Sequence, residues 1–152
     1  MKNLILITTL FLVNITFAQV NLNAESFKQK MTEKNRMIVL TDISYFEPDD
    51  AQSLVRLLLY SNQIDIEGLI ASTNEVRRNQ ILPEIIEKTI EAYGKVQPNL
   101  LKHEAGFPTA KSLLPLIKKG LPLYGMEGVG KGKDSEGSEW ILKMLEKKYM
   151  IY

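Results

Sequence analysis

The sequence has 152 residues, of which 45% are hydrophobic and 24% are charged, as in an ordinary globular protein with one core. Its formal net charge of +1 gives no general attraction to nucleic acid or to anionic membranes. The chain contains no cysteine, which excludes disulfides, thiol catalysis and zinc–cysteine sites. Composition therefore predicts a single domain of ordinary surface charge.

Residues 1–18 have the pattern of a secretory signal peptide. Lys2 precedes a mostly apolar run over residues 4–17, and the small Ala18 stands where a signal peptidase would cleave. The run is short for a bilayer-spanning helix, although an uncleaved anchor or a buried helix is the alternative. We expect residues 19–36 to form a polar linker. The mature protein would then be secreted or periplasmic, with no membrane anchor.

The next segments alternate between strand and helix patterns. Residues 37–40 are an apolar run typical of a parallel strand, and residues 49–60 carry apolar side chains at helical spacing after Pro48. Residues 64–71 predict a second strand. Residues 83–93 predict a second helix, which we expect Gly94 to end.

The remainder of the chain predicts mostly helices. We expect a turn at residues 97–99 and a helix over 109–120, capped by Thr109. A last helix would begin near residue 134, and residues 149–152 resemble the start of a third strand. This order predicts an α/β fold with a parallel sheet and flanking helices. Because so few strands leave a sheet poorly covered, we expect residues 37–152 to be the N-terminal part of a larger, truncated domain.

Acidic side chains gather where the first predicted strand leads into the first helix. Asp42 closes the strand, and Glu47, Asp49 and Asp50 follow it. Asn74 ends the second strand, so it should reach the same edge of the sheet, where α/β proteins bind ligands. Oxygen ligands of this kind suit a hard cation, calcium before magnesium, whose bound water would lie beside Asp42. Alternatively, the acidic residues only stabilise the helix N-terminus.

Several stretches resemble a known family. The run from Val39 through Asp42 to Ala51 is similar to the acidic signature of the nucleoside hydrolase fold. The whole pattern resembles a secreted bacterial branch of nucleoside-hydrolase-like proteins, often labelled cellulose-binding. The supporting stretches are residues 50–58, 65–71, 99–103 and 132–140.

The resemblance implies a role for each residue of the acidic segment. Asp42 would bind calcium and act as the base toward the attacking water, and Asp50 would be a second metal ligand. Asp49 would contact sugar hydroxyls, and Asn74 would help to place the sugar and the water; we add Glu47 to the substrate-binding residues. The implied reaction is hydrolysis of an N-ribosyl or other glycosidic bond in a nucleoside or carbohydrate, through an oxocarbenium-like transition state.

The sequence also departs from the enzyme pattern. Leu40 stands where the enzymes have an aspartate, and residues 43–48 contain no glycine. Calcium takes about six to eight oxygens, so the few carboxylates present predict a weak site and no activity for this chain alone. A non-catalytic carbohydrate-binding (cellulose-binding) protein is the alternative function, and a nonfunctional gene fragment is the third.

Other features carry weaker predictions. Residues 125–131 have the spacing of a phosphate-binding loop but lack the hydroxyl residue after Lys131, so we favour a surface loop. His103 is expected at the surface or in packing. Ser135 and Ser138 are expected to cap the last helix, and Trp140 is expected in the core rather than as a sugar platform.

Overall fold

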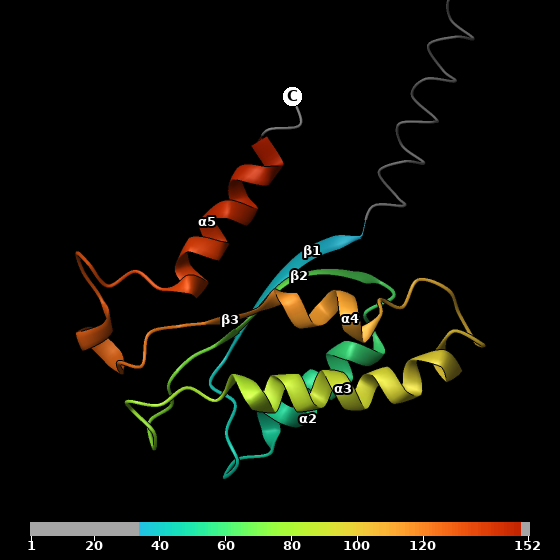
Figure 1. The fold of residues 1–152 in the computed structure, drawn as a ribbon, viewed down its shortest axis with the longest axis horizontal. Helices are drawn as coiled ribbons and strands as arrows, with labels where there is room; N and C mark the ends of the chain where they lie inside the picture. The colour runs from blue at the N-terminus through green and yellow to red at the C-terminus, as the bar shows by residue number, and fades with distance from the viewer. Residues whose placement is uncertain (1–33, 150–152) are drawn as a thin grey trace, which may run out of the picture. The chain divides into compact units, whose positions relative to one another are not determined.

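The structure is a computed structural model and describes residues 34–149. These residues form a sheet with helices on both faces (Figure 1). The α/β fold predicted from the sequence is confirmed. In chain order, the elements are β1 (Asn35–Thr41), α2 (Asp49–Leu59), β2 (Ile64–Ala71), α3 (Pro83–Leu100), α4 (Ala110–Leu113), η1 (Leu114–Leu116), β3 (Ile117–Lys119), η2 (Gly125–Gly128) and α5 (Glu136–Tyr149).

The described strands form one parallel sheet in the order β1-β2-β3. Strand β3 was not predicted at its position in the structure, because residues 117–119 were expected to continue a helix from Thr109. Thr109 does cap α4, accepting a bond from Ser112 N at 3.1 Å, but η1 follows at Pro115, and Ile117 then pairs with Leu69. The proline interrupts the helix, and pairing with β2 takes over. The strand expected at residues 149–152 lies mostly outside the described residues, and Tyr149 belongs to α5.

A β-bulge in β2 decides which side chains face which helices. Met37 pairs with Ile66 and Ile38 with Gly68, so Glu67 is the extra residue. Ile66 and Leu69 therefore lie in the same core although they are three residues apart, which simple alternation would not allow. Without the bulge, one end of β2 would present its apolar side chains to the wrong face.

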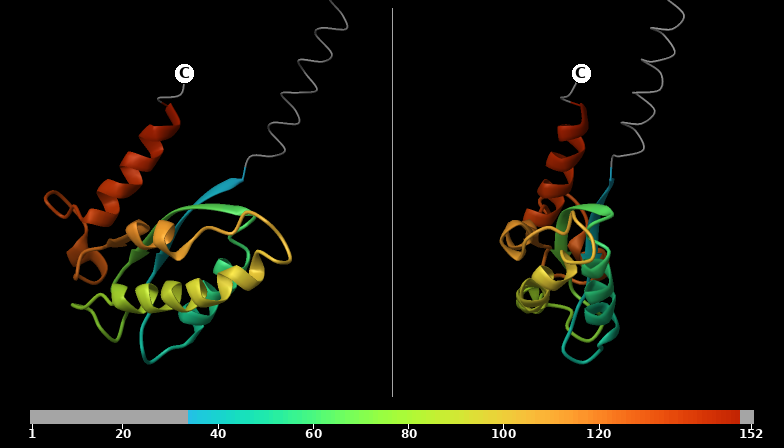
Figure 2. Two further views of the ribbon diagram at one scale, coloured as in Figure 1. Left: turned by 45° about the vertical axis from the view of Figure 1, so that its right-hand side comes forward. Right: turned by 90° about the vertical axis from the view of Figure 1, so that its right-hand side faces the viewer.

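The two faces of the sheet carry different layers. Helices α2 and α3 pack against each other on one face and α5 lies on the other, as the views of Figures 1 and 2 agree. The main core lies on the α2–α3 side, where Leu58, Leu69, Ile86 and Ile90 are fully buried. β1 begins at Asn35, two residues before the predicted start of the domain.

The prediction that α3 ends at Gly94 was wrong, because the helix continues to Leu100 through Gly94 and Pro98. Gly94 instead allows close packing: a Cβ there would lie 2.8 Å from that of Ala110. One turn later, Gln97 is buried and donates to Phe107 O at 3.2 Å. Tertiary contacts along this face therefore outweigh the glycine and proline stop signals.

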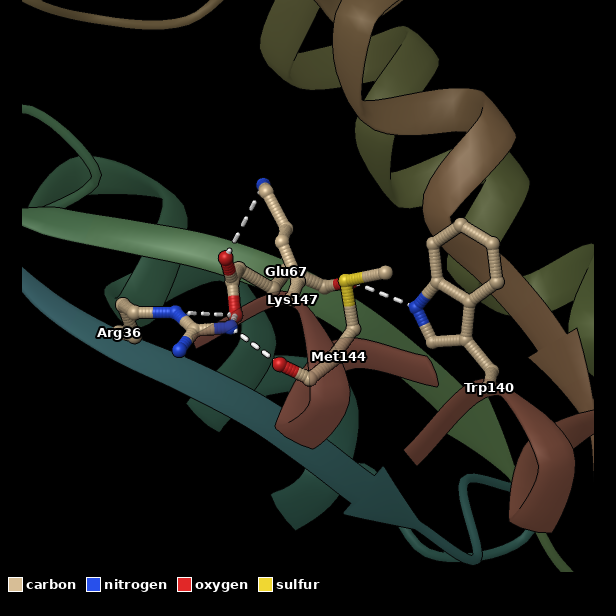
Figure 3. Close-up of polar contacts among 5 residues, drawn as sticks. All are labelled: Arg36, Glu67, Trp140, Met144 and Lys147. Carbon is tan, nitrogen blue, oxygen red and sulfur yellow. Dashed lines mark hydrogen bonds and ion pairs between the residues drawn. The ribbon is translucent and has the colours of Figure 1, made fainter. Parts of the chain in front are cut away.

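A polar network fixes α5 to the sheet (Figure 3). Glu67 is buried and accepts a bond from Arg36 Nε at 2.7 Å, and Lys147 Nζ lies 3.5 Å from its other oxygen. Arg36 also donates to Met144 O at 2.6 Å, and Trp140 Nε1 donates to Glu67 O at 2.7 Å. The bulge thus turns a carboxylate toward α5, where two cations meet it.

Among residues 34–149, no helix is long and apolar enough to cross a membrane. The predicted signal peptide (residues 1–18) and nearly all of the predicted linker (residues 19–36) lie outside the described residues.

Candidate functional site

The first part of the candidate site lies where β1 leads into α2. Thr41 Oγ1 donates to Asp50 Oδ2 at 2.5 Å and accepts from Ile43 N at 3.2 Å. Asp42 follows directly, and the negative charge of Asp50 acts on its carboxyl group. The strand end and the first turn of the helix thus bring together the two residues predicted as metal ligands.

The proximity of these carboxyl groups changes the acidity of Asp42. Asp42 is exposed, yet its pKa is raised above the ordinary value, first by the partial loss of hydration at the strand end and then by the neighbouring Asp50 carboxyl group and the negative charge of Asp49. Among the described residues, no cation is close enough to lower it. A carboxylate held in this way is a better proton acceptor than an ordinary aspartate.

A compact turn carries the chain from Asp42 to α2. Ser44 is buried, and its Oγ accepts from Phe46 N and Glu47 N, each at 3.3 Å. Ile43 is also buried and joins the core beneath the turn. The serine hydroxyl and the buried isoleucine hold this turn in place, although residues 43–48 contain no glycine.

Asn74 joins the loops that follow β1 and β2. It is 6% exposed, donates from Nδ2 to Asp42 O at 3.2 Å, and accepts at Oδ1 from Arg77 N at 2.6 Å. Both ends of its amide are therefore bonded to backbone. Asn74 reaches the predicted edge of the sheet, where these contacts fix the position of Asp42.

The two other predicted substrate residues are at the surface of the same edge. Asp49 lies in the first turn of α2 and Glu47 lies just before it, and both are exposed. Asp49 acts on Asp42 through its charge. Each side chain is thus accessible to a ligand from solvent.

Exposed aromatic residues beside the acidic pair were missed by the sequence analysis. Phe46 is 63% exposed, and the Arg77 guanidinium lies 4.9 Å from its ring centre. Tyr45 is 59% exposed, and its hydroxyl is 3.5 Å from Lys88 Nζ. The available signal was two adjacent aromatic residues within an acidic loop. Arg77 Nε is also buried with no hydrogen-bond partner among the described residues, which is uncommon in native structures.

The residues at this site offer the type of ligand that calcium prefers, but too few of them. Carboxylate oxygens are suitable ligands, and a cation would relieve the repulsion between Asp42 and Asp50. Yet no group of three or more His, Cys, Asp or Glu side chains within residues 34–149 is arranged to hold a metal ion. The described residues therefore do not form a full calcium site.

The remaining predictions concern residues away from this edge or in its loops. Ser138 N donates to Ser135 Oγ at 3.1 Å and Ser135 N to Ser138 Oγ at 2.8 Å, so these serines cap α5 as predicted. His103 is exposed.

Trp140 is half-buried, with Lys118 and Lys143 over its ring at 4.5 and 5.1 Å, so it is not an open sugar platform. Residues 125–128 form η2, without the strand-to-helix geometry of a phosphate loop.

Comparison with known proteins identifies the fold. Residues 36–151 match the family described as cellulose-binding Sde182, nucleoside hydrolase-like domain. A solved structure of a nucleoside hydrolase-related protein from Saccharophagus degradans, described as associated with carbohydrate metabolism, superposes with a TM-score of 0.69 at 38% identity. No curated protein matches.

The match to the Saccharophagus degradans protein covers only part of that protein. The alignment covers 75% of this chain but 28% of the Saccharophagus degradans protein, so the chain spans well under half of that length. The family match itself covers most of this sequence, from β1 through α5. The chain therefore belongs to the nucleoside hydrolase-like domain family of the cellulose-binding Sde182 proteins.

Proposed function

We propose that the chain is a secreted carbohydrate-binding domain whose ligand lies at the carboxyl edge of the sheet. The observation that carries the proposal is the combination of the exposed rings of Tyr45 and Phe46 with the Asp42–Asp50 pair on one short loop. A sugar has an apolar face of C–H groups, which packs on an aromatic ring, and hydroxyls, which donate to carboxylates. The family is described as cellulose-binding and the Saccharophagus degradans protein as associated with carbohydrate metabolism, and both descriptions support the same ligand class.

The proposal is tested by titrating cellohexaose into the full chain. Phe46→Ala should weaken binding about tenfold, because the stacking surface is lost. Tyr60→Ala is a matched control, since Tyr60 is 66% exposed against 63% for Phe46 but lies at the other end of α2. Equal loss in both variants, or no binding by the unaltered chain, would overturn the proposal.

A second candidate function is hydrolysis of an N-ribosyl or other glycosidic bond. It is favoured by the raised pKa of Asp42, which suits a base toward water. In this candidate, Asn74 holds the Asp42 backbone in place through its side-chain amide. Release of nitrophenol from nitrophenyl glycosides, lost in Asp42→Asn, would support it; unchanged release in that variant would assign it to a contaminant.

A further inference from the structure

A polar cleft lies beside the candidate site, between the segments that follow β2 and β3. Its volume is about 470 Å³, within the usual range of small-ligand pockets. Glu75, Arg78 and Asn79 line it from the first segment, and Tyr124 and Glu127 from the second.

Several contacts hold the walls of the cleft together. Thr73 Oγ1 donates to Leu123 O at 3.3 Å, which ties one wall to the other. The Arg78 guanidinium lies 5.0 Å from the centre of the Tyr124 ring, and its Nε donates to Glu75 O at 3.2 Å. Gly128 packs closely beneath, since a Cβ there would lie 3.1 Å from Leu123 O. The walls of the cleft are thus braced, while Glu75 and Arg78 form an ion pair at 3.9 Å at its rim and are themselves 80% and 64% exposed.

The chemistry of the lining favours a neutral, hydroxyl-rich ligand. Glu75 and Glu127 supply acceptors, while Arg78 and Asn79 supply donors, and Tyr124 supplies an aromatic edge. Two carboxylates against one guanidinium leave the lining negative, which disfavours a carboxylated or phosphorylated ligand. A sugar unit without an ionised group satisfies both kinds of polar group.

The position of the cleft connects it to the acidic pair. Glu75 directly follows Asn74, whose amide donates to Asp42 O at 3.2 Å. A ligand in the cleft and a ligand at Asp42 would therefore lie on adjoining loops of the same sheet edge. An oligosaccharide can occupy both places at once, whereas a single sugar or a nucleoside cannot gain from both.

We propose that this cleft is a second sugar subsite, which takes a neutral pyranose unit of a chain whose other units lie at Asp42 and Phe46. The proposal rests on the proposed carbohydrate-binding function. It narrows the ligand to a neutral oligosaccharide or polysaccharide. The cleft makes longer sugar chains bind more tightly than shorter ones and disfavours charged glycans.

The test measures affinity against chain length with the full chain. Cellotetraose should bind about tenfold more tightly than cellobiose, and Tyr124→Ala should remove that difference while leaving cellobiose affinity unchanged. Arg78→Gln, at a side chain 64% exposed, is the second variant should Tyr124→Ala fold poorly, and it should reduce the same difference. Tyr60→Ala is again the control.

The outcomes separate the two proposals. Phe46→Ala weakening both sugars, with Tyr124→Ala and Arg78→Gln both within twofold of the unaltered chain, would overturn the subsite and retain carbohydrate binding. Absence of binding to either sugar would overturn both. Tighter binding of tetragalacturonate than of cellotetraose would overturn the assignment to a neutral glycan.

Discussion

Two clusters of charged residues lie on this small sheet, and they are built in opposite ways. Between the sheet and α5, the buried carboxylate of Glu67 meets Arg36 at 2.6 Å and Lys147 at 3.5 Å (Figure 3). At the carboxyl edge, Asp42 meets another acid, Asp50, and no cation among the described residues offsets them. One cluster balances its charge and the other does not.

The pKa directions express the same difference. Burial acts to raise the pKa of Glu67, but the hydrogen bond and charge of Arg36, with the charge of Lys147, outweigh it and leave the pKa lowered. For the exposed Asp42, partial loss of hydration and the neighbouring acids act together and raise the pKa. Compensated charge is typical of a structural contact, whereas concentrated like charge is typical of a site that binds or reacts.

The largest expected effect is on the stability provided by the cluster of Glu67, Arg36 and Lys147. Glu67→Ala should lower the free energy of unfolding by about 2 kcal/mol, because it removes the acceptor of Arg36 and Lys147 from a buried position. The measurement is urea unfolding of the full chain followed by circular dichroism. Glu91→Ala, at an exposed position on α3, is the control and should change stability by less than about 0.5 kcal/mol. Equal stability of both variants would show that the α5 contact is not structural.

A smaller effect should appear in the pH dependence of stability, with opposite signs in the two clusters. The pKa of Glu67 is lowered from its ordinary value of 4.5, so its contribution is present above that pH and is lost as pH falls through the folded pKa. The pKa of Asp42 is raised from 3.8, so its contribution is present below that value and is lost as pH rises through the folded pKa.

The two contributions are measured separately by comparing the unfolding free energies of the unaltered chain, Glu67→Gln and Asp42→Asn from about pH 2 to about pH 8. Glu67→Gln should lose part of the fall in stability on the acid side. Asp42→Asn should instead gain relative stability as pH rises above the folded pKa of Asp42. Parallel profiles for the two variants would contradict the contrast between the clusters.

Calcium should have the smallest effect. Two carboxylates with water as the remaining ligands predict a Kd of about 1 mM, and calcium at that concentration adds about 0.4 kcal/mol to stability. Thermal unfolding with and without calcium measures it, with magnesium as the ionic-strength control. Asp50→Asn should abolish the shift while keeping an acceptor for Thr41. Micromolar binding would mean that the described residues form a fuller site than their arrangement indicates.

Local patterns predicted the parts of the fold that depend on neighbouring residues. The apolar run before Asp42, the helical spacing after Pro48 and the run at 64–71 each identified an element of the structure. Local patterns failed where contacts between distant parts of the chain determine the secondary structure. Gly94 lies within a helix because Ala110 packs on it, and residues 117–119 form a strand because β2 offers them an edge.

The sequence by itself determined that Asp42, Glu47, Asp49 and Asp50 would gather at the end of a strand, because they are close along the chain and one turn of backbone joins them. Only the tertiary structure decided what surrounds them. The partner of Asn74, the rings beside the acidic pair and the cleft at Tyr124 join segments separated by about 30 to 50 residues. The bulge at Glu67 likewise depends on how two strands align. Such contacts are set by the packing of the whole sheet, which no local pattern encodes.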